Sequence, residues 1–174
     1  MGEQRAPSIV AIATKYGLIQ GVLAFALFFS GIAAGIKHDW VVSVISAALL
    51  IVLMFLAHRE FKKTHDRMMT YPQGLGSGTL LASVGAVVRC VLVYGYLKYI
   101  NTGYIGTLVQ TQRRALEQRG ITGAQAQQAL AISSAITTPV GIAVMALITG
   151  VIVGFIVALI VSIFTQKADP RAVI

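Results

Sequence analysis

The chain has 174 residues, enough for about one domain, and 56% of them are hydrophobic while 11% are charged. An ordinary soluble domain carries about 25% charged residues. Together with a mean hydropathy of +0.79, this shortage of charge excludes a soluble enzyme, a disordered chain and a disulfide scaffold. The composition predicts an all-α, polytopic integral membrane protein.

The positive charge of the chain fits a membrane better than a nucleic acid. Fourteen Lys and Arg residues against six Asp and Glu residues give a net charge of +8. Half of the basic residues flank apolar stretches, where membrane topology and lipid headgroups place them. No basic face interleaved with aromatic residues is present. We therefore expect the lipid bilayer as a partner, and no nucleic acid.

Four apolar stretches are long enough to cross a bilayer. The first is a charge-free run of 21 residues, which at 1.5 Å per residue spans a hydrocarbon core of about 30 Å. Thr138 is a plausible N-cap for the last stretch, with Pro139 at its first helical position. The sequence predicts a single membrane domain over 1–174, with transmembrane helices at about 16–36, 40–57, 79–100 and 139–165.

The basic residues also indicate an orientation. Four spans put both termini and the loop from His58 to Gly78 on one side, with eight Lys and Arg residues against five on the other. Because cytoplasmic loops carry the excess of Lys and Arg, we expect both termini in the cytoplasm.

Two segments follow the second span. A cluster of four basic residues is predicted to lie on a helical extension of that span. We expect this cluster to face anionic lipid or, as the alternative, a cytoplasmic partner. The glycine-rich segment 74–78, which follows Tyr71 and Pro72, is expected to end this extension as a flexible turn. The cluster consists of Arg59, Lys62, Lys63 and Arg67.

The segment 101–138 is too long for a plain connection and has helical patterns of its own. Apolar residues from Ile105 to Leu116 fall near one face, and Gly120 is a natural C-terminal stop. Thr122 then precedes a second helix that reaches Ile136. We expect an extramembrane helical loop between the third and fourth spans.

Arg89 is the most informative residue, since it is eleventh of the 22 residues predicted for the third span. An arginine at a helix centre costs about 2.5–3.5 kcal/mol on insertion scales, so it calls for a function or a partner. No Asp or Glu occurs in the four predicted spans. Several acceptors remain open for Arg89: backbone carbonyls, water, a lipid phosphate reached by snorkelling, an entering anion, a carboxylate of another subunit, or hydroxyls such as those of Ser43, Ser46, Thr149 or Tyr94.

Glycines at a spacing of four residues form a second signal. Such pairs let membrane helices approach closely, either within one chain or between subunits, and the spacing does not choose between these. The pairs are Gly17 and Gly21, Gly31 and Gly35, and Gly150 and Gly154.

No catalytic, cofactor-binding or metal-binding pattern is found. His58 and His65 are seven residues apart, and no cysteine or carboxylate completes a ligand set at helical spacing. All three histidines fall outside the predicted spans, so neither a proton relay nor an intramembrane protease is indicated. We expect a protein that is not an enzyme and that has neither a metal nor a cofactor.

In its order of features the chain resembles a family of small bacterial inner-membrane proteins known as a domain of unknown function. The resemblance rests on Tyr16-Gly17-Leu18, the basic segment after the second span, GLGSG before a third span that ends in YGYLKYI, and the long loop before Pro139. It implies a four-helix bundle in a bacterial inner membrane.

The expected function is non-catalytic. We predict a packing or assembly subunit of a larger membrane complex, associated with other membrane subunits or with copies of itself. The alternative is a small oligomeric channel or transporter, in which Arg89 selects an anion.

Overall fold

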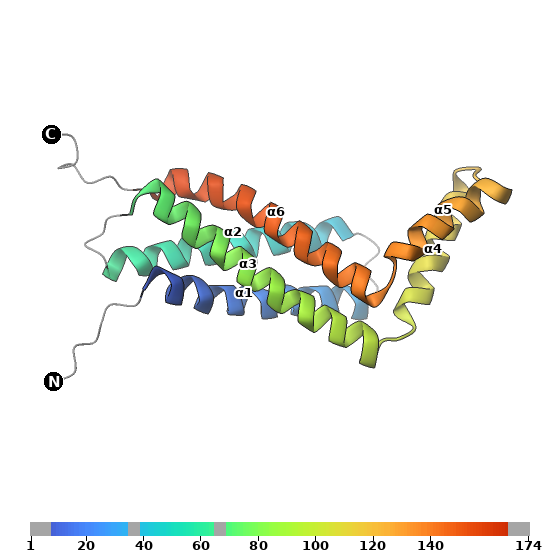
Figure 1. The fold of residues 1–174 in the computed structure, drawn as a ribbon, viewed down its shortest axis with the longest axis horizontal. Coiled ribbons are helices and arrows are strands. Elements are labelled where there is room, and N and C mark those ends of the chain that lie inside the picture. The colour runs from blue at the N-terminus through green and yellow to red at the C-terminus, as the bar shows by residue number, and fades with distance from the viewer. Residues whose placement is uncertain (1–7, 35–38, 65–68, 167–174) are drawn as a thin grey trace. The chain divides into compact units, whose positions relative to one another are not determined.

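The computed structural model describes residues 8–34, 39–64 and 69–166, which form helices in the order α1, α2, α3, η1, α4, α5, α6 (Figure 1). Four of these elements are long and apolar enough to cross a membrane. The prediction of an all-α protein with four spans is confirmed. The chain divides into two compact units, one of residues 1–89 and 147–174 and the other of residues 90–146.

The first two helices extend beyond the predicted spans. Helix α1 (Ile9–Ala33) begins seven residues earlier than expected, because the Ser8 hydroxyl caps it by accepting a 3.2 Å hydrogen bond from the Ala11 N–H. Helix α2 (Asp39–Thr64) continues without a break through Lys63. The helical extension predicted for the basic cluster is therefore present as far as the structure describes it, and Arg67 lies outside the described residues.

The expected glycine-rich turn before the third span is wrong. Helix α3 (Tyr71–Gly95) starts at Tyr71 and includes all three glycines of segment 74–78. A five-residue π-helix, η1 (Tyr96–Ile100), follows it, so the continuous apolar element is 30 residues long. Glycine disfavours a helix interior by about 1 kcal/mol, but close packing against a neighbouring helix offsets that cost here.

Helix α6 (Pro139–Thr165) begins where the sequence indicates. The Thr138 hydroxyl accepts a 2.9 Å hydrogen bond from the Gly141 N–H, as an N-cap should. Pro139 occupies the first helical position, where its missing N–H costs nothing.

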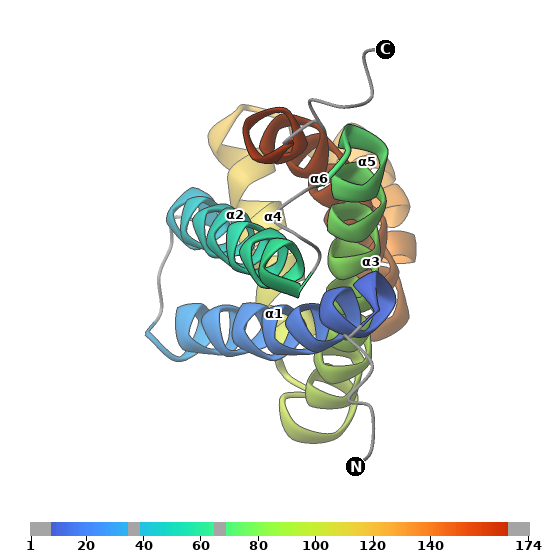
Figure 2. The same cartoon turned by 90° about the vertical axis from the view of Figure 1, so that its left-hand side faces the viewer.

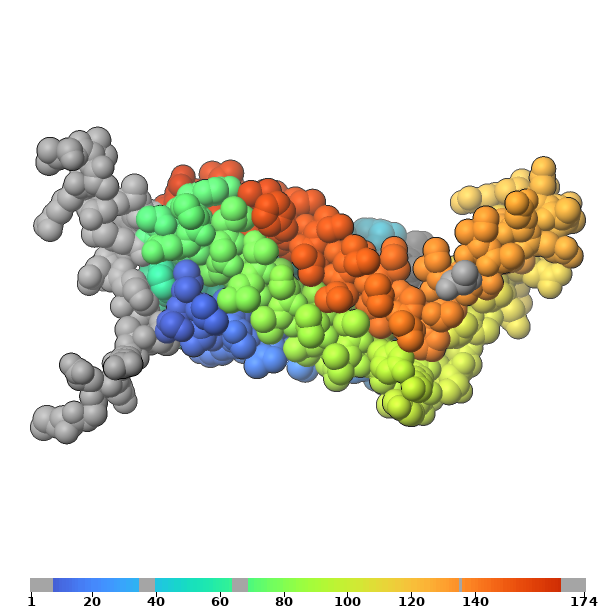
Figure 3. Space-filling model, in the orientation of Figure 1, coloured from blue at the N-terminus to red at the C-terminus, as the bar shows by residue number. Residues whose placement is uncertain are grey.

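The first unit brings together α1, α2, most of α3 and the C-terminal part of α6 (Figure 2). Their directions alternate, so the start of α1, the end of α2, the start of α3 and the end of α6 gather at one end of the unit, the terminal end (Figure 1). On the face drawn in Figure 3, side chains of α3 in green and α6 in red meet along this unit. Its core lies nearer the terminal end and includes Met54, Leu81 and Ala158, each fully buried.

The second unit contains the two helices expected between the last two spans. They are α4 (Tyr104–Gln118) and α5 (Gly123–Ile136), joined by a turn with Gly120 at φ +75° and Gly123 at φ +65°. A residue with a Cβ is strained at such φ values, which is why glycine ends α4 here. Ser133 of α5 donates a hydrogen bond to the Gln112 side chain of α4, tying the two helices together.

Candidate functional site

Glycines allow α1 and α3 to lie in close contact. A Cβ added to Gly17 would come within 2.7 Å of the Leu81 carbonyl oxygen, and one added to Gly21 within 2.7 Å of the Gly85 carbonyl oxygen. These are backbone atoms of α3, which cannot move aside independently. The Gly17 and Gly21 pair thus faces a helix of the same chain.

The contact between α3 and α6 is built in the same way. Gly150 lies against Ala86, where an added Cβ would be 3.0 Å from the Ala86 Cβ, and a Cβ on Gly154 would overlap Ala82. Gly78 of α3 in turn faces Ala158 of α6. Small residues from both helices therefore hold α3 against α6 within one chain.

The third predicted pair is described in part. Gly31 lies near the start of α2, where an added Cβ would be 3.1 Å from a Val42 methyl group. Gly35 lies outside the described residues.

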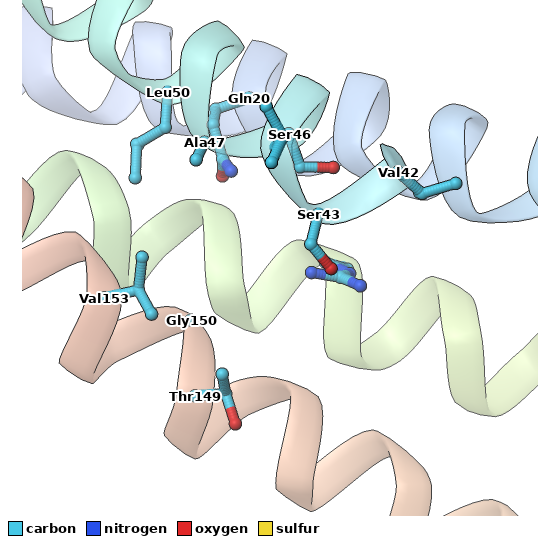
Figure 4. A pocket seen from close by; sticks show the side chains of 11 residues that line it. Gln20, Val42, Ser43, Ser46, Ala47, Leu50, Thr149, Gly150 and Val153 are labelled. Carbon is cyan, nitrogen blue, oxygen red and sulfur yellow. The ribbon is translucent and has the colours of Figure 1, made fainter. Parts of the chain in front are cut away.

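A pocket of about 370 Å³ lies among the four helices of the first unit (Figure 4). Gln20, Ser43 and Thr149 bring polar groups to it from α1, α2 and α6. Among the described residues that line it none is acidic. They are Gln20, Val42, Ser43, Val44, Ser46, Ala47, Leu50, Arg89, Thr149, Gly150 and Val153.

Arg89 supplies the positive charge of this pocket. It is the nineteenth residue of the 30-residue apolar element, about 5 Å past its midpoint, and so farther along the span than the sequence suggested. Its Nε is buried and has no hydrogen-bond partner within the described part of the chain. Such a group needs an acceptor, since burying an N–H group without a hydrogen bond is unfavourable.

Gln20 is the pocket residue that the sequence did not single out. Its Oε1 is also buried without a hydrogen-bond partner among the described residues. The side chain lies over Gly85, where any Cβ would collide with the amide. A polar residue within an apolar helix was the available signal. Since the amide can rotate to present its NH₂ group, Gln20 can offer the pocket either a donor or an acceptor.

The hydroxyls suggested as partners for Arg89 divide into two groups. Ser43, Ser46 and Thr149 line the pocket with it. Tyr94 is engaged elsewhere, because its hydroxyl accepts a 2.8 Å hydrogen bond from Lys98.

A carboxylate does lie in a helix long enough to span the membrane, which the shorter predicted spans did not include. Glu60, near the end of α2, forms a 3.0 Å ion pair with Lys15 and accepts a 2.7 Å hydrogen bond from the Tyr16 hydroxyl. These bonds join α1 to α2 at the terminal end of the unit. Glu60 is therefore committed to other partners than Arg89.

His58 lies inside a candidate span, contrary to the expectation that every histidine lies outside the spans. It is 1% exposed, and its Nδ1 is 2.8 Å from the Thr165 hydroxyl oxygen. Thr165 can donate its own hydrogen to the Val161 carbonyl, and on that basis we assign Nδ1 as the donor to Thr165. His58 thereby ties α2 to α6. His65 lies outside the described residues.

The comparisons with known proteins give a family. The model of the DUF4199 family, described as a protein of unknown function, matches residues 15–167. The chain therefore belongs to this family, which confirms the resemblance to a domain of unknown function. Among curated proteins and solved structures, none matches the chain.

Proposed function

We propose that this member of the DUF4199 family acts without catalysis, as a subunit of a larger membrane assembly in which the Arg89 pocket receives an anionic group of a partner. The observation that carries the proposal is the buried Arg89 Nε, which lacks an acceptor in the described part of the chain. Bilayer hydrocarbon cannot supply that acceptor.

A carboxylate on a partner helix fits this pocket well. Arg89 is its cation, the hydroxyls of Ser46 and Thr149 are neutral donors, and the described lining offers no negative charge to repel an acid. Charged side chains within membranes usually pair with one another in this way. Glu60 is already bonded to Lys15 and Tyr16, which supports a carboxylate on a partner helix as the acceptor for Arg89.

The test is native mass spectrometry of the full-length protein, extracted mildly from the membrane in which it is made. We expect the wild type to retain another subunit, Arg89→Gln to lose it, and Arg89→Lys to retain part of it because the charge remains. The control is Arg114→Gln, which removes an exposed positive charge from α4. Equal retention by Arg89→Gln and the wild type would refute the proposal.

A small channel or transporter for an anion is the second candidate. It is favoured by the hydroxyl groups that line the pocket beside Arg89, because neutral donors bind an anion without holding it as tightly as a second cation. In liposomes, this function predicts chloride flux that Arg89→Gln abolishes while subunit association is unchanged. If Arg89→Gln alters neither flux nor association, both functions are wrong.

A further inference from the structure

A second hollow region lies between α2 and α6 at the terminal end of the first unit. It consists of two adjoining depressions, one of about 590 Å³ and one of about 370 Å³, which share the side chains of Phe55 and Phe164. We call the two together the α2–α6 groove. None of its described lining residues belongs to the Arg89 pocket.

The two parts of the groove differ in chemistry. The larger part, nearer the end of α2, is lined by Arg59, Lys62 and Lys63, and the described residues around it include no acidic side chain. Glu60, which is next in sequence to Arg59, forms hydrogen bonds with Lys15 and Tyr16 of α1 and does not line this part, although Lys63 lies within electrostatic range of it. This part is therefore a cationic site open to solvent or headgroups.

The smaller part is wholly apolar. Besides the two shared phenylalanines it is lined by Ile51, Val157, Ile160 and Val161. From Arg59 back to Ile51 is eight residues, or about 12 Å along α2. This is close to the thickness of one leaflet of hydrocarbon, about 15 Å.

We propose that the α2–α6 groove is a binding site for an anionic phospholipid. The phosphate of the headgroup meets Arg59 and Lys63, and an acyl chain lies along the apolar part between Phe55 and Phe164. Charge complementarity selects an anionic lipid over a zwitterionic one. The direct continuation of the cationic part into an apolar one selects a lipid over a free phosphate.

The test compares phosphatidylglycerol with phosphatidylcholine of the same acyl chains, titrated onto the full-length protein and counted as bound lipid by native mass spectrometry. Phosphatidylglycerol should bind more tightly. The double variant Arg59→Gln with Lys63→Gln should weaken it by about fivefold for each cation removed. The control pair, Arg114→Gln with Arg119→Gln, removes the same charge from α4 and the turn after it, and should leave binding unchanged.

A second pair of variants tests the acyl part without any change of charge. Ile160→Trp fills the apolar depression and should reduce phosphatidylglycerol binding, whereas Ile163→Trp should not, because Ile163 is similarly exposed on α6 (56% against 52%) but does not line the groove. Circular dichroism verifies that the variants keep their helices.

Three results would overturn the proposal. They are equal affinity for the two lipids, equal losses in the test and control variants, and glycerol phosphate binding as tightly as the intact lipid. The last result would identify a site for a free phosphate instead.

Discussion

Substituting Gly21 by alanine should destabilise the contact between α1 and α3. The new Cβ would lie 2.6 Å from the Val88 Cβ and 2.7 Å from the Gly85 carbonyl oxygen. Carbon atoms in favourable contact are about 3.5–4.0 Å apart, so the two helices would have to separate by about 1 Å. Both obstructing atoms are fixed to the α3 backbone, and a change of rotamer cannot relieve the clash.

The size of the effect follows from two opposing terms. Forcing an extra methyl group into a packed core costs about 1–3 kcal/mol. Replacing glycine by alanine inside a helix stabilises the folded state by about 0.5–1 kcal/mol. Gly76→Ala is the matched control, since Gly76 is also within a helix but an added Cβ meets no atom within 4 Å. Both variants gain the same helix propensity from alanine, so only the steric cost of the added methyl group distinguishes them. Their free energies of unfolding should therefore differ by about 1–3 kcal/mol.

The assay is reversible unfolding in mixed micelles, with the fraction of denaturing detergent increased and the helix content followed by circular dichroism. Gly76→Ala should be as stable as the wild type or more stable, and Gly21→Ala should unfold at a lower fraction of denaturing detergent. Equal midpoints for the two variants would show that α1 and α3 do not pack closely through Gly21.

Substitutions at three further positions test other contacts by the same unfolding measurement. Arg89→Met should stabilise the isolated chain by about 1–4 kcal/mol, because an apolar residue of similar volume removes a half-buried cation whose Nε has no acceptor in the described chain; a loss of stability would mean that the rest of the guanidinium is already paired. Thr165→Val should cost about 1–3 kcal/mol, since the buried His58 Nδ1 loses its acceptor, and an unchanged midpoint would contradict that bond. Thr138→Ala should cost about 0.5–2 kcal/mol through loss of the cap on Gly141, whereas Thr138→Ser should restore most of it.

The sequence by itself determined the features that depend only on residues close together along the chain. Hydropathy and length identified the four spans, because crossing a bilayer requires about 20 consecutive apolar residues whatever the rest of the chain does. Local backbone rules likewise located the end of α4 at Gly120 and the cap of α6 at Thr138. Membership of a family of unknown function was also predictable from the order of these segments.

Contacts between distant segments were decided by the tertiary structure. The glycines from 74 to 78 indicate a turn when read locally, but the neighbouring helix α6 offers Ser162 and Ala158 as packing partners for Gly74 and Gly78. A helix is then favoured, since close contact in a membrane outweighs the low helix propensity of glycine. These packing partners could not be inferred from the sequence, because they lie 80 and 88 residues away along the chain.

The environments of the charged and polar residues depend on the fold for the same reason. The sequence showed that Arg89 needs an acceptor, but not that Gln20 lies in the same pocket. It also showed a basic cluster on α2, but not that Phe164 of α6 completes an apolar groove beside it. Hydropathy measures the affinity of each segment for the bilayer, whereas a pocket requires side chains from several helices to meet at one depth. The packing of the helices sets that meeting point.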